Sequence, residues 1–320
     1  MQRNFLSVFV MLFAFASAVL ASSAPDDLLA TGRADDTLRT LQQRVAANSN
    51  DAAAHNLLCR TYFALEDWTQ AVHSCERSVE LQPNSSFYQM WMGRAYGRRA
   101  EHVGPISAYS IARKSLEAMN RAVKLDPSNI DARRDLAEYL ANAPGVAGGD
   151  RDRALKLADE IAEHDLVNAS LIRAMISAAA GDRGEAERQH KIAIQASGGS
   201  ANTLLELAHL YRKQKRWPEF ESLINRAISN NPDPADLFDA AELLVVSGRN
   251  LNGAMSLLQR YLAGPTDESG PAFRAHLLMG QALEKSGDRD AAADQYRAAL
   301  ALASNYRPAQ DALRRLGATA

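Results

Sequence analysis

The sequence predicts an all-α protein, a right-handed superhelical solenoid of helix-turn-helix repeats with a C-terminal capping helix. Three observations lead to this prediction. Apolar residues recur at helical spacing along most of the chain. An order of small and large apolar residues restarts with a period of about 34 residues. Turn residues, as at Gly181-Asp182 and Gly287-Asp288, separate the two halves of several repeats.

The composition is that of a folded chain without a strong charge bias. Of the 320 residues, 47% are hydrophobic and 23% are charged, and 36 basic against 38 acidic residues leave a formal net charge of -2. A nearly neutral chain gives no reason to expect nucleic acid or an anionic membrane as its main partner. We therefore expect no nucleic-acid binding.

Residues 1–21 differ from the rest of the chain. Arg3 is the only charged residue before Asp26, and Phe5–Leu20 is an almost unbroken apolar run that ends in small residues at Ala21. This order of segments is typical of a cleaved secretory signal peptide, so we predict an exported protein. The alternative is a retained membrane anchor, since the run is close to the shortest spanning length. No later stretch is long and apolar enough to span a bilayer, so no stable span is expected after cleavage.

About seven copies of the repeat pattern, with the capping helix, fill residues 52–316. One position in the first helix of a copy and one in the second carry small residues, which lets the two antiparallel helices approach closely. Larger apolar residues follow in each helix and fill the space between neighbouring pairs. The small residues are Cys59, Gly93, Ala137, Ala208 and Gly280 in first helices, and Ala71, Ala154, Ala186 and Ala292 in second helices.

This pattern resembles the tetratricopeptide-repeat family, whose repeat has W-x2-L-G-x2-Y in its first helix, then A-x3-F and a closing Pro. The resemblance covers residues 52–316 and implies a non-catalytic scaffold or adaptor that binds a protein or peptide segment in its concave groove. The clearest copy starts at Ala52 and carries Leu58, Cys59, Tyr62, Ala71, Cys75 and Pro83 at the matching positions.

The ends of the repeat region are expected to form simpler elements. Residues 22–51 are interpreted as a linker and an N-terminal helix or half-repeat, because Leu38, Leu41 and Val45 form a helical stripe. Pro308–Leu316 is predicted to be the helix that covers the open end of the stack. Residues 317–320 are a short tail.

Two repeats carry extra residues between their helices. Gly97–Tyr109 contains about ten more residues than the template, and Ala143–Asp150 is a second insertion. Both should emerge on the same edge of the solenoid, where insertions often belong to a binding surface. The alternative is a surface loop that costs little stability. The Ala-Pro-Gly-x-x-Gly-Gly sequence is similar to a loop of some exported bacterial repeat proteins, which favours the periplasm, with secretion as the alternative.

The two cysteines of the chain occupy facing positions in the first predicted helix pair. Cys59 lies in the first helix and Cys75 in the second. In an oxidising compartment such a pair forms a disulfide, which closes a loop of about 17 residues and stabilises the fold by about 3 kcal/mol. The alternative is a pair of buried thiols that act as small core residues.

The predicted concave groove of the first three repeats is rich in arginine. Guanidinium groups bind carboxylates well, so an acidic segment or a C-terminal carboxylate is a reasonable guest. In the alternative interpretation these arginines are solvated and paired with neighbouring Glu or Asp. Trp91 lies beside the groove and is a candidate aromatic anchor. The candidate arginines are Arg60, Arg94, Arg98, Arg133 and Arg134.

The sequence has no catalytic or metal-binding motif. The seven histidines are scattered, no His-Glu-x-x-His or Cys-x-x-Cys occurs, and no Gly-x-Ser-x-Gly is present. We therefore expect no enzyme activity, no metal and no cofactor. The leading hypothesis is a scaffold or adaptor of the cell envelope, and the alternative is an accessory subunit of an envelope enzyme or of a maturation or assembly machine.

Overall fold

The computed structural model of the chain describes residues 25–229 and 232–318. Within these residues the protein is entirely helical, with seventeen α-helices, one short 3-10 helix and no strand, which confirms the all-α prediction. None of the helices in this part of the chain is long and apolar enough to cross a membrane. The expected signal peptide at residues 1–21 lies outside the described residues.

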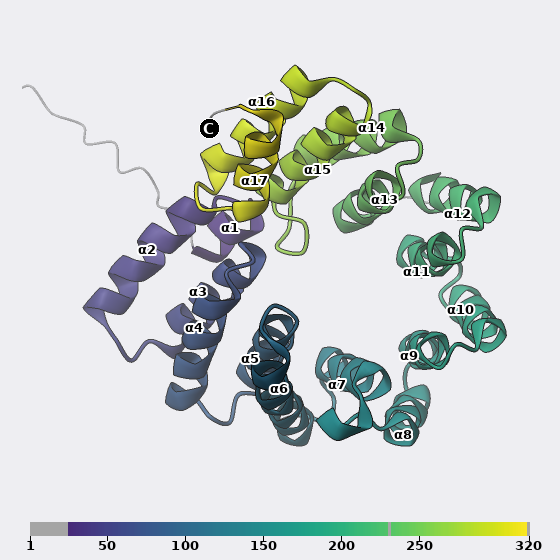
Figure 1. The fold of residues 1–320 in the computed structure, drawn as a ribbon. Helices are drawn as coiled ribbons and strands as arrows, with labels where there is room; N and C mark the ends of the chain where they lie inside the picture. The colour runs from purple at the N-terminus through teal and green to yellow at the C-terminus, as the bar shows by residue number, and fades with distance from the viewer. Residues whose placement is uncertain (1–24, 230–231, 319–320) are drawn as a thin grey trace, which may run out of the picture.

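The helices follow one another as two N-terminal helices, seven consecutive pairs and a last single helix (Figure 1). From α7 to α14 the first helix of each pair lies on the inside of the curved stack and the second on the outside. The bounds are α1 (Pro25–Ala30), α2 (Ala34–Ala47), α3 (Ala52–Ala64), α4 (Trp68–Leu81), α5 (Ser86–Ala100), α6 (Pro105–Leu125), α7 (Ile130–Asn142), η1 (Gly145–Ala147), α8 (Arg151–Ala162), α9 (Leu166–Ala179), α10 (Arg183–Ala196), α11 (Ala201–Lys213), α12 (Trp217–Ser229), α13 (Pro234–Ser247), α14 (Leu251–Leu262), α15 (Ala272–Lys285), α16 (Arg289–Leu302) and α17 (Arg307–Leu316).

The turns inside the repeats explain the Gly-Asp pairs of the sequence. Gly181 and Gly287 have φ of 83° and 92°, a left-handed conformation that glycine adopts without steric cost. The aspartate that follows is the N-cap of the next helix, where the carboxylate accepts the backbone N–H three residues on. In the first repeat Glu66 takes the left-handed position, with φ of 59°, and Asp67 is the cap. Each turn therefore stops one helix and starts its partner.

Small residues allow the two helices of a pair to pack closely. A Cβ atom on Gly280 would lie 2.4 Å from the ring of Tyr296, and one on Gly93 would lie 2.8 Å from Cγ of Met119. Both distances are far below ordinary contact, because protein interiors are packed as densely as crystals. At the equivalent place in other pairs, Ala137 and Ala208 are fully buried.

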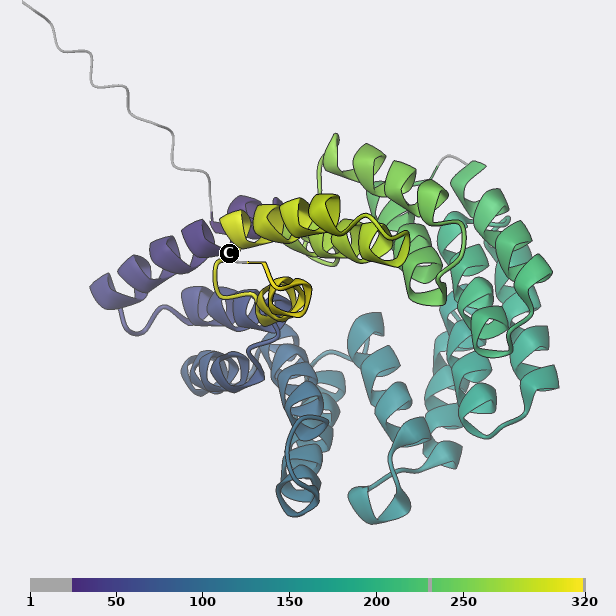
Figure 2. The same ribbon diagram turned by 45° about the horizontal axis from the view of Figure 1, so that its top comes forward.

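The curved stack closes on itself, so that the first helices lie beside the last (Figures 1 and 2). One apolar cluster joins Leu29 and Leu41, from the N-terminal helices, to Phe273, Tyr306 and Leu313 near the C-terminus. Polar contacts accompany the apolar ones. Thr266 Oγ1 donates to the carbonyl of Ala30 at 2.9 Å, and the carboxylate of Asp35 accepts the backbone N–H of Ser304 at 3.0 Å. The molecule is therefore a ring of helices.

The helix α17 packs on the last helix pair, as predicted for the capping helix, and it also meets the N-terminal helices. Ala309, Ala312 and Leu313 of this helix are buried in the cluster that includes the N-terminal helices. Its other side is polar as expected, since the side chains of Arg314 and Arg315 are mostly exposed. The additional contact arises because α1 to α3 have apolar faces of their own, and the curvature of the ring brings those faces to the end of the stack.

The two insertions take different forms. The extra residues of Gly97–Tyr109 do not form a long loop, because α5 continues to Ala100 and the 21-residue α6 already starts at Pro105. Proline suits the first turn of a helix, where its missing N–H is not needed. The second insertion contains η1, and the Tyr139 hydroxyl donates to the carbonyl of Ala147 at 2.8 Å. The first insertion thus lengthens a helix pair, and the second is a short, anchored segment.

Candidate functional site

A large cavity lies on the inner side of the ring. It has a volume of about 1150 Å³ and is lined mainly by α5, α6, α7, α9 and α11, together with the segment around η1 and isolated residues of α3 and α10. Its walls are mixed in character. Leu171 and Met175 of α9 give it apolar surface, whereas Asp135 and Glu138 of α7 and Glu206 of α11 add carboxylates. Both insertions contribute to the lining, through Tyr109, Val146 and their neighbours.

Three of the predicted arginines line the cavity, and two of them, Arg94 and Arg134, are bound to carboxylates of neighbouring helices. Arg94 Nε donates to Asp135 Oδ2 at 2.5 Å, and Arg134 Nη2 donates to Glu206 Oε1 at 2.5 Å. The arginine side chains are 25% and 37% exposed, so both pairs are partly shielded from solvent. The pairs connect α5 to α7 and α7 to α11 across the inner wall. These arginines therefore hold the repeats together.

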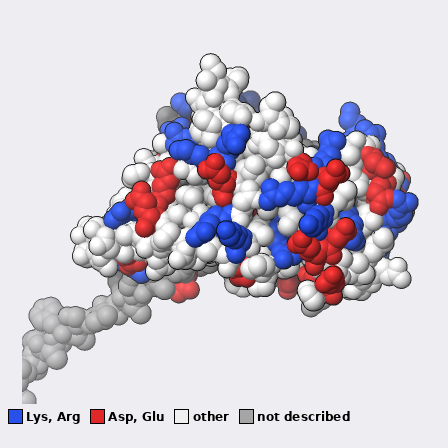
Figure 3. All heavy atoms as spheres, turned by 90° about the horizontal axis from the view of Figure 1, so that it is seen from below, with Lys and Arg blue, Asp and Glu red and all other residues white. Residues whose placement is uncertain are grey.

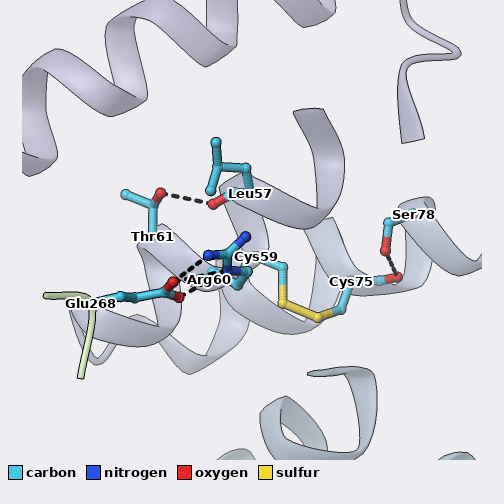
Figure 4. Close-up of a disulfide and its surroundings, with 7 residues drawn as sticks. All are labelled: Leu57, Cys59, Arg60, Thr61, Cys75, Ser78 and Glu268. Atoms are coloured by element: carbon cyan, nitrogen blue, oxygen red, sulfur yellow. Dashed lines mark hydrogen bonds and ion pairs between the residues drawn. A yellow bond between two sulfur atoms is a disulfide. The ribbon is translucent and has the colours of Figure 1, made fainter. Parts of the chain in front are cut away.

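Arg60 is bound to a carboxylate from the C-terminal part of the chain. Its Nε donates to both carboxylate oxygens of Glu268, at 2.9 and 3.1 Å (Figure 4). Glu268 belongs to the segment between α14 and α15, and 208 residues separate the two partners. The Arg60 side chain is 19% exposed and does not line the cavity. The predicted groove residue is thus a closure contact of the ring.

The remaining two arginines lie in different surroundings. Arg98 lines the cavity, and its Nη1 donates to Glu101 Oε2 at 2.7 Å. Arg133 lies 3.7 Å from Glu160 of α8 and is absent from the cavity lining. The structure therefore brings Arg94, Arg98 and Arg134 together on the inner wall but places Arg60 and Arg133 elsewhere. All five predicted arginines have a carboxylate partner, so the positive charge expected for a guest is already neutralised.

Trp91 is packed into a cluster of rings and guanidinium groups. Its ring lies 5.4 Å from that of Phe63 in an edge-on arrangement and 6.4 Å from that of Phe87. The guanidinium of Arg94 lies 5.0 Å from the Trp91 ring, within the range of a cation–π contact. The Trp91 Nε1 atom is buried and has no hydrogen-bond partner within the described residues. Phe87, 42% exposed, is the more open aromatic side chain of this cluster.

Desolvation shifts the pKa of several groups around the cavity. Desolvation raises the pKa of Asp135, against the opposing effect of Arg94. Desolvation also raises the pKa of Glu138, and the charge of Asp135 adds to this effect. His209 on α11 shows the opposite case, because burial and the nearby Lys213 lower its pKa to about 4. His209 is therefore neutral at physiological pH.

Sequence reasoning missed the carboxylates of the inner wall. Asp135 and Glu138 of the cavity lining lie three residues apart on α7, a spacing that places side chains on one face of a helix. This spacing in the sequence is enough to predict an acidic strip on one face of the helix. The wall is consequently mixed in charge, and Figure 3 shows acidic and basic side chains interspersed on the face of the molecule seen from below.

Cys59 and Cys75 are joined by a disulfide that links α3 to α4 (Figure 4). Their Cα atoms are 5.1 Å apart, and both residues are fully buried. Next to them the Ser78 hydroxyl donates to the carbonyl of Cys75 at 2.8 Å. The crosslink thus lies inside the first helix pair, away from the cavity. Nowhere in the described residues do three His, Cys, Asp or Glu side chains come together as a metal site would require.

Comparison with known proteins agrees with this architecture. Residues 273–306, which contain α15 and α16, match the tetratricopeptide repeat family. Yeast Tom70 has a similar fold, with a TM-score of 0.54 and 15% identity over 97% of this chain and 66% of Tom70. MamA matches 54% of this chain and 94% of its own, with a TM-score of 0.43 and 19% identity.

A relative from Drosophila melanogaster, the BBSome complex member BBS4 homolog, is 20% identical over 248 residues. The match covers 75% of this chain and 48% of that protein, so the chain spans about half the length of this relative. Residues 273–306 thus match a tetratricopeptide repeat, and the seven helix pairs and the fold shared with Tom70 show that the chain has the fold of a tetratricopeptide-repeat solenoid.

Proposed function

We propose that this protein is a non-catalytic scaffold or adaptor of the cell envelope, and that it binds a segment of a partner protein on the inner side of the ring. The cavity of about 1150 Å³ is the observation that carries the proposal. Tetratricopeptide-repeat proteins generally serve as interaction scaffolds, and in repeat proteins the concave side is an extended binding surface. The chemistry of the side chains on this surface decides the specificity.

The closed ring restricts the form of the partner. Contacts between the N-terminal helices and α15 to α17 join the two ends of the stack. A folded domain would have to break these contacts to reach the inner wall from the side. An extended or helical segment fits better, because a cavity of this size accepts a small number of side chains.

The paired arginines of the inner wall give no support to an acidic partner segment. The expectation of such a segment assumed arginines open to a guest carboxylate, whereas Arg94, Arg98 and Arg134 of the inner wall are bound to Asp135, Glu101 and Glu206. A guest carboxylate would have to displace one of these internal partners. Its binding would therefore bring little net gain in charge interactions.

The envelope location rests on two sequence features. Residues 1–21 have the organisation of a secretory signal peptide. The disulfide between Cys59 and Cys75 is of the kind that persists in oxidising compartments. Fractionation of the native cells, with detection of the protein in the periplasmic extract, checks this part of the proposal. Retention in the cytoplasm with both cysteines reduced would contradict it.

Photo-crosslinking tests the binding surface. A photo-reactive amino acid in place of Met175, in the cavity wall, should crosslink one defined partner in intact cells. The same amino acid in place of Arg188, whose side chain is 67% exposed on α10 outside the cavity, is the matched control. Equal crosslinking from both positions, or none from Met175, would refute the proposal. The identity of the partner then separates a scaffold from an accessory subunit of an envelope enzyme.

A further inference from the structure

Each of the two insertions carries exposed apolar side chains, Ile106 and Tyr109 on the first and Val146 on the second, and these are called the rim below. Tyr109 of α6 and Val146 of η1 both line the cavity and are 44% and 76% exposed. Ile106, one turn before Tyr109, is 94% exposed. Seven large apolar side chains are exposed in the described part of the chain, and these three lie on the two insertions. Clustered apolar exposure of this kind marks an interaction surface.

The rim is held in a fixed shape. Tyr139 is bound to the carbonyl of Ala147, and the backbone N–H of Asp150 donates to the carbonyl of Leu140 at 2.8 Å. Gly148, with φ of 93°, packs against α6 so closely that a Cβ atom would lie 2.5 Å from Leu116. A surface that is already ordered loses little entropy when it binds a partner.

Next to the rim lies a carboxylate without a partner. Glu138 lines the cavity, yet no donor within the described residues forms a hydrogen bond or ion pair with its side chain, whereas Asp135, Glu101 and Glu206 each hold an arginine. Arg134, the cation that acts most strongly on Glu138, is bound to Glu206.

The charges around Glu138 leave this part of the wall acidic. Besides Arg134, the groups that act on it are the carboxylates Asp135, Glu206 and Glu101. Desolvation is the main cause that raises the pKa of Glu138, and the neighbouring carboxylates add to it. The residue is nevertheless exposed, so its carboxylate is open to a guest. Two further cations of the lining, Arg183 and Lys213, lie on α10 and α11 and are not among the groups that act most strongly on Glu138.

We propose that this rim and Glu138 together bind a partner segment in which an apolar side chain lies close to a lysine or arginine. The apolar side chain packs on Tyr109 and Val146, and the cation forms a charge-assisted hydrogen bond with Glu138. The inference rests on the proposed function and names the chemistry of the partner. The partner segment proposed here is basic, whereas the arginines alone suggest an acidic one.

Selection from random peptides tests this chemistry directly. Short random peptides displayed on phage are selected on the full chain with its disulfide intact, and in parallel on the Glu138→Gln variant. We expect the wild-type selection to enrich peptides with apolar residues next to a lysine or arginine. The selection on Glu138→Gln should lose the preference for a basic residue. Enrichment of acidic peptides, or of none, would overturn the proposal.

The affinity of a synthetic form of the enriched peptide then measures the contribution of the charge pair between its lysine and Glu138. Replacing its lysine by norleucine should weaken binding about tenfold, as expected for a charge pair at an interface. Glu138→Gln should weaken the lysine peptide by a similar factor and leave the norleucine peptide unchanged. Glu163→Gln, on an exposed residue outside the cavity, is the matched control and should change neither. Equal binding of the lysine peptide by wild type and Glu138→Gln would refute the inference.

The rim has a test of its own. Val146→Asp should weaken both peptides, because the apolar contact is common to them. Failure of the peptide experiments together with a partner crosslinked from Met175 would sink this inference and leave the proposed function standing. Absence of crosslinking from Met175 would count against the proposed function itself.

Discussion

At the scale of single residues, Asp239 on α13 shows how the shape of the fold controls a charge. Desolvation by the surrounding protein and the neighbouring carboxylate of Glu242 raise the pKa of Asp239 to about 7, against the opposing effect of Arg274. Arg274 Nη2 is already bound to Glu242 Oε1 at 2.5 Å and compensates Asp239 only in part. The carboxyl group therefore changes its charge near neutral pH, although its sequence position gives no hint of this.

The shift of Asp239 makes stability depend on pH with a definite sign. Its pKa in the folded protein is about 7 and its ordinary value is 3.8, so between these values the folded state binds more protons. The free energy of unfolding should therefore fall as the pH rises from about 4 to 7. Asp239→Asn should flatten this decline and be more stable than wild type at pH 8.

Chemical denaturation of both proteins at pH 5 and pH 8 measures this effect. Asp294→Asn is a suitable control, because the side chain of Asp294 is 74% exposed on α16. It should leave the pH dependence of wild type unchanged. If the free energy of unfolding changes with pH in the same way for wild type and Asp239→Asn, the pKa of Asp239 is not raised in the folded protein.

At the scale of elements, the first helix pair is the one with a covalent link. In the other pairs a small residue alone lets the two helices meet, as Gly93 and Gly280 do. In α3 the small position is Cys59, and its disulfide with Cys75 of α4 spans 16 positions of the sequence. The spacing of the repeat places the two residues opposite each other, so this contact follows from local sequence.

Loss of the disulfide should destabilise the protein. In the chain-entropy treatment, a loop of about 17 residues corresponds to about 3 kcal/mol of unfolding free energy. Cys59→Ala/Cys75→Ala should show this decrease in urea denaturation. A reductant should lower the free energy of unfolding of wild type to a similar value. The double variant should not respond to the reductant. Two free thiols in the mass spectrum of the protein from its native compartment would contradict a role for the disulfide there.

At the scale of the whole molecule, the ring is closed by a small set of contacts between distant segments. Arg60 and Glu268 form one of them, and the cluster around Leu29, Phe273 and Tyr306 forms another. Solenoids depend mainly on contacts between neighbouring repeats. Closure adds contacts that join the ends, so opening the ring exposes apolar surface at both of them.

Charge reversal at the closure contact tests its contribution. Arg60→Glu places two carboxylates face to face and should lower the free energy of unfolding by about 2 kcal/mol, the scale of a hydrogen-bonded charge pair. The swap Arg60→Glu/Glu268→Arg should restore most of this loss. Small-angle X-ray scattering should show a larger radius of gyration for Arg60→Glu alone. Arg39→Glu, on a side chain that is 67% exposed, is the control and should have a much smaller effect.

The sequence by itself determined the repeats and the pairing inside them. The helix period, the Gly-Asp turns and the small residues at fixed positions are local signals, and they specify which helices pack together within a pair. The cysteines could be placed opposite each other for the same reason. The five candidate arginines could be assigned to repeats, but their partners could not.

Only the tertiary structure decided the closure of the ring and the charge of its inner wall. Arg60 meets Glu268 across 208 residues, and Arg134 meets Glu206 across 72. These contacts depend on the curvature accumulated over successive helix pairs, which a pattern within one repeat does not encode. The same curvature leaves the Glu138 side chain without an ion-pair partner among the described residues, because Arg94, Arg98 and Arg134 of the wall are bound to other carboxylates.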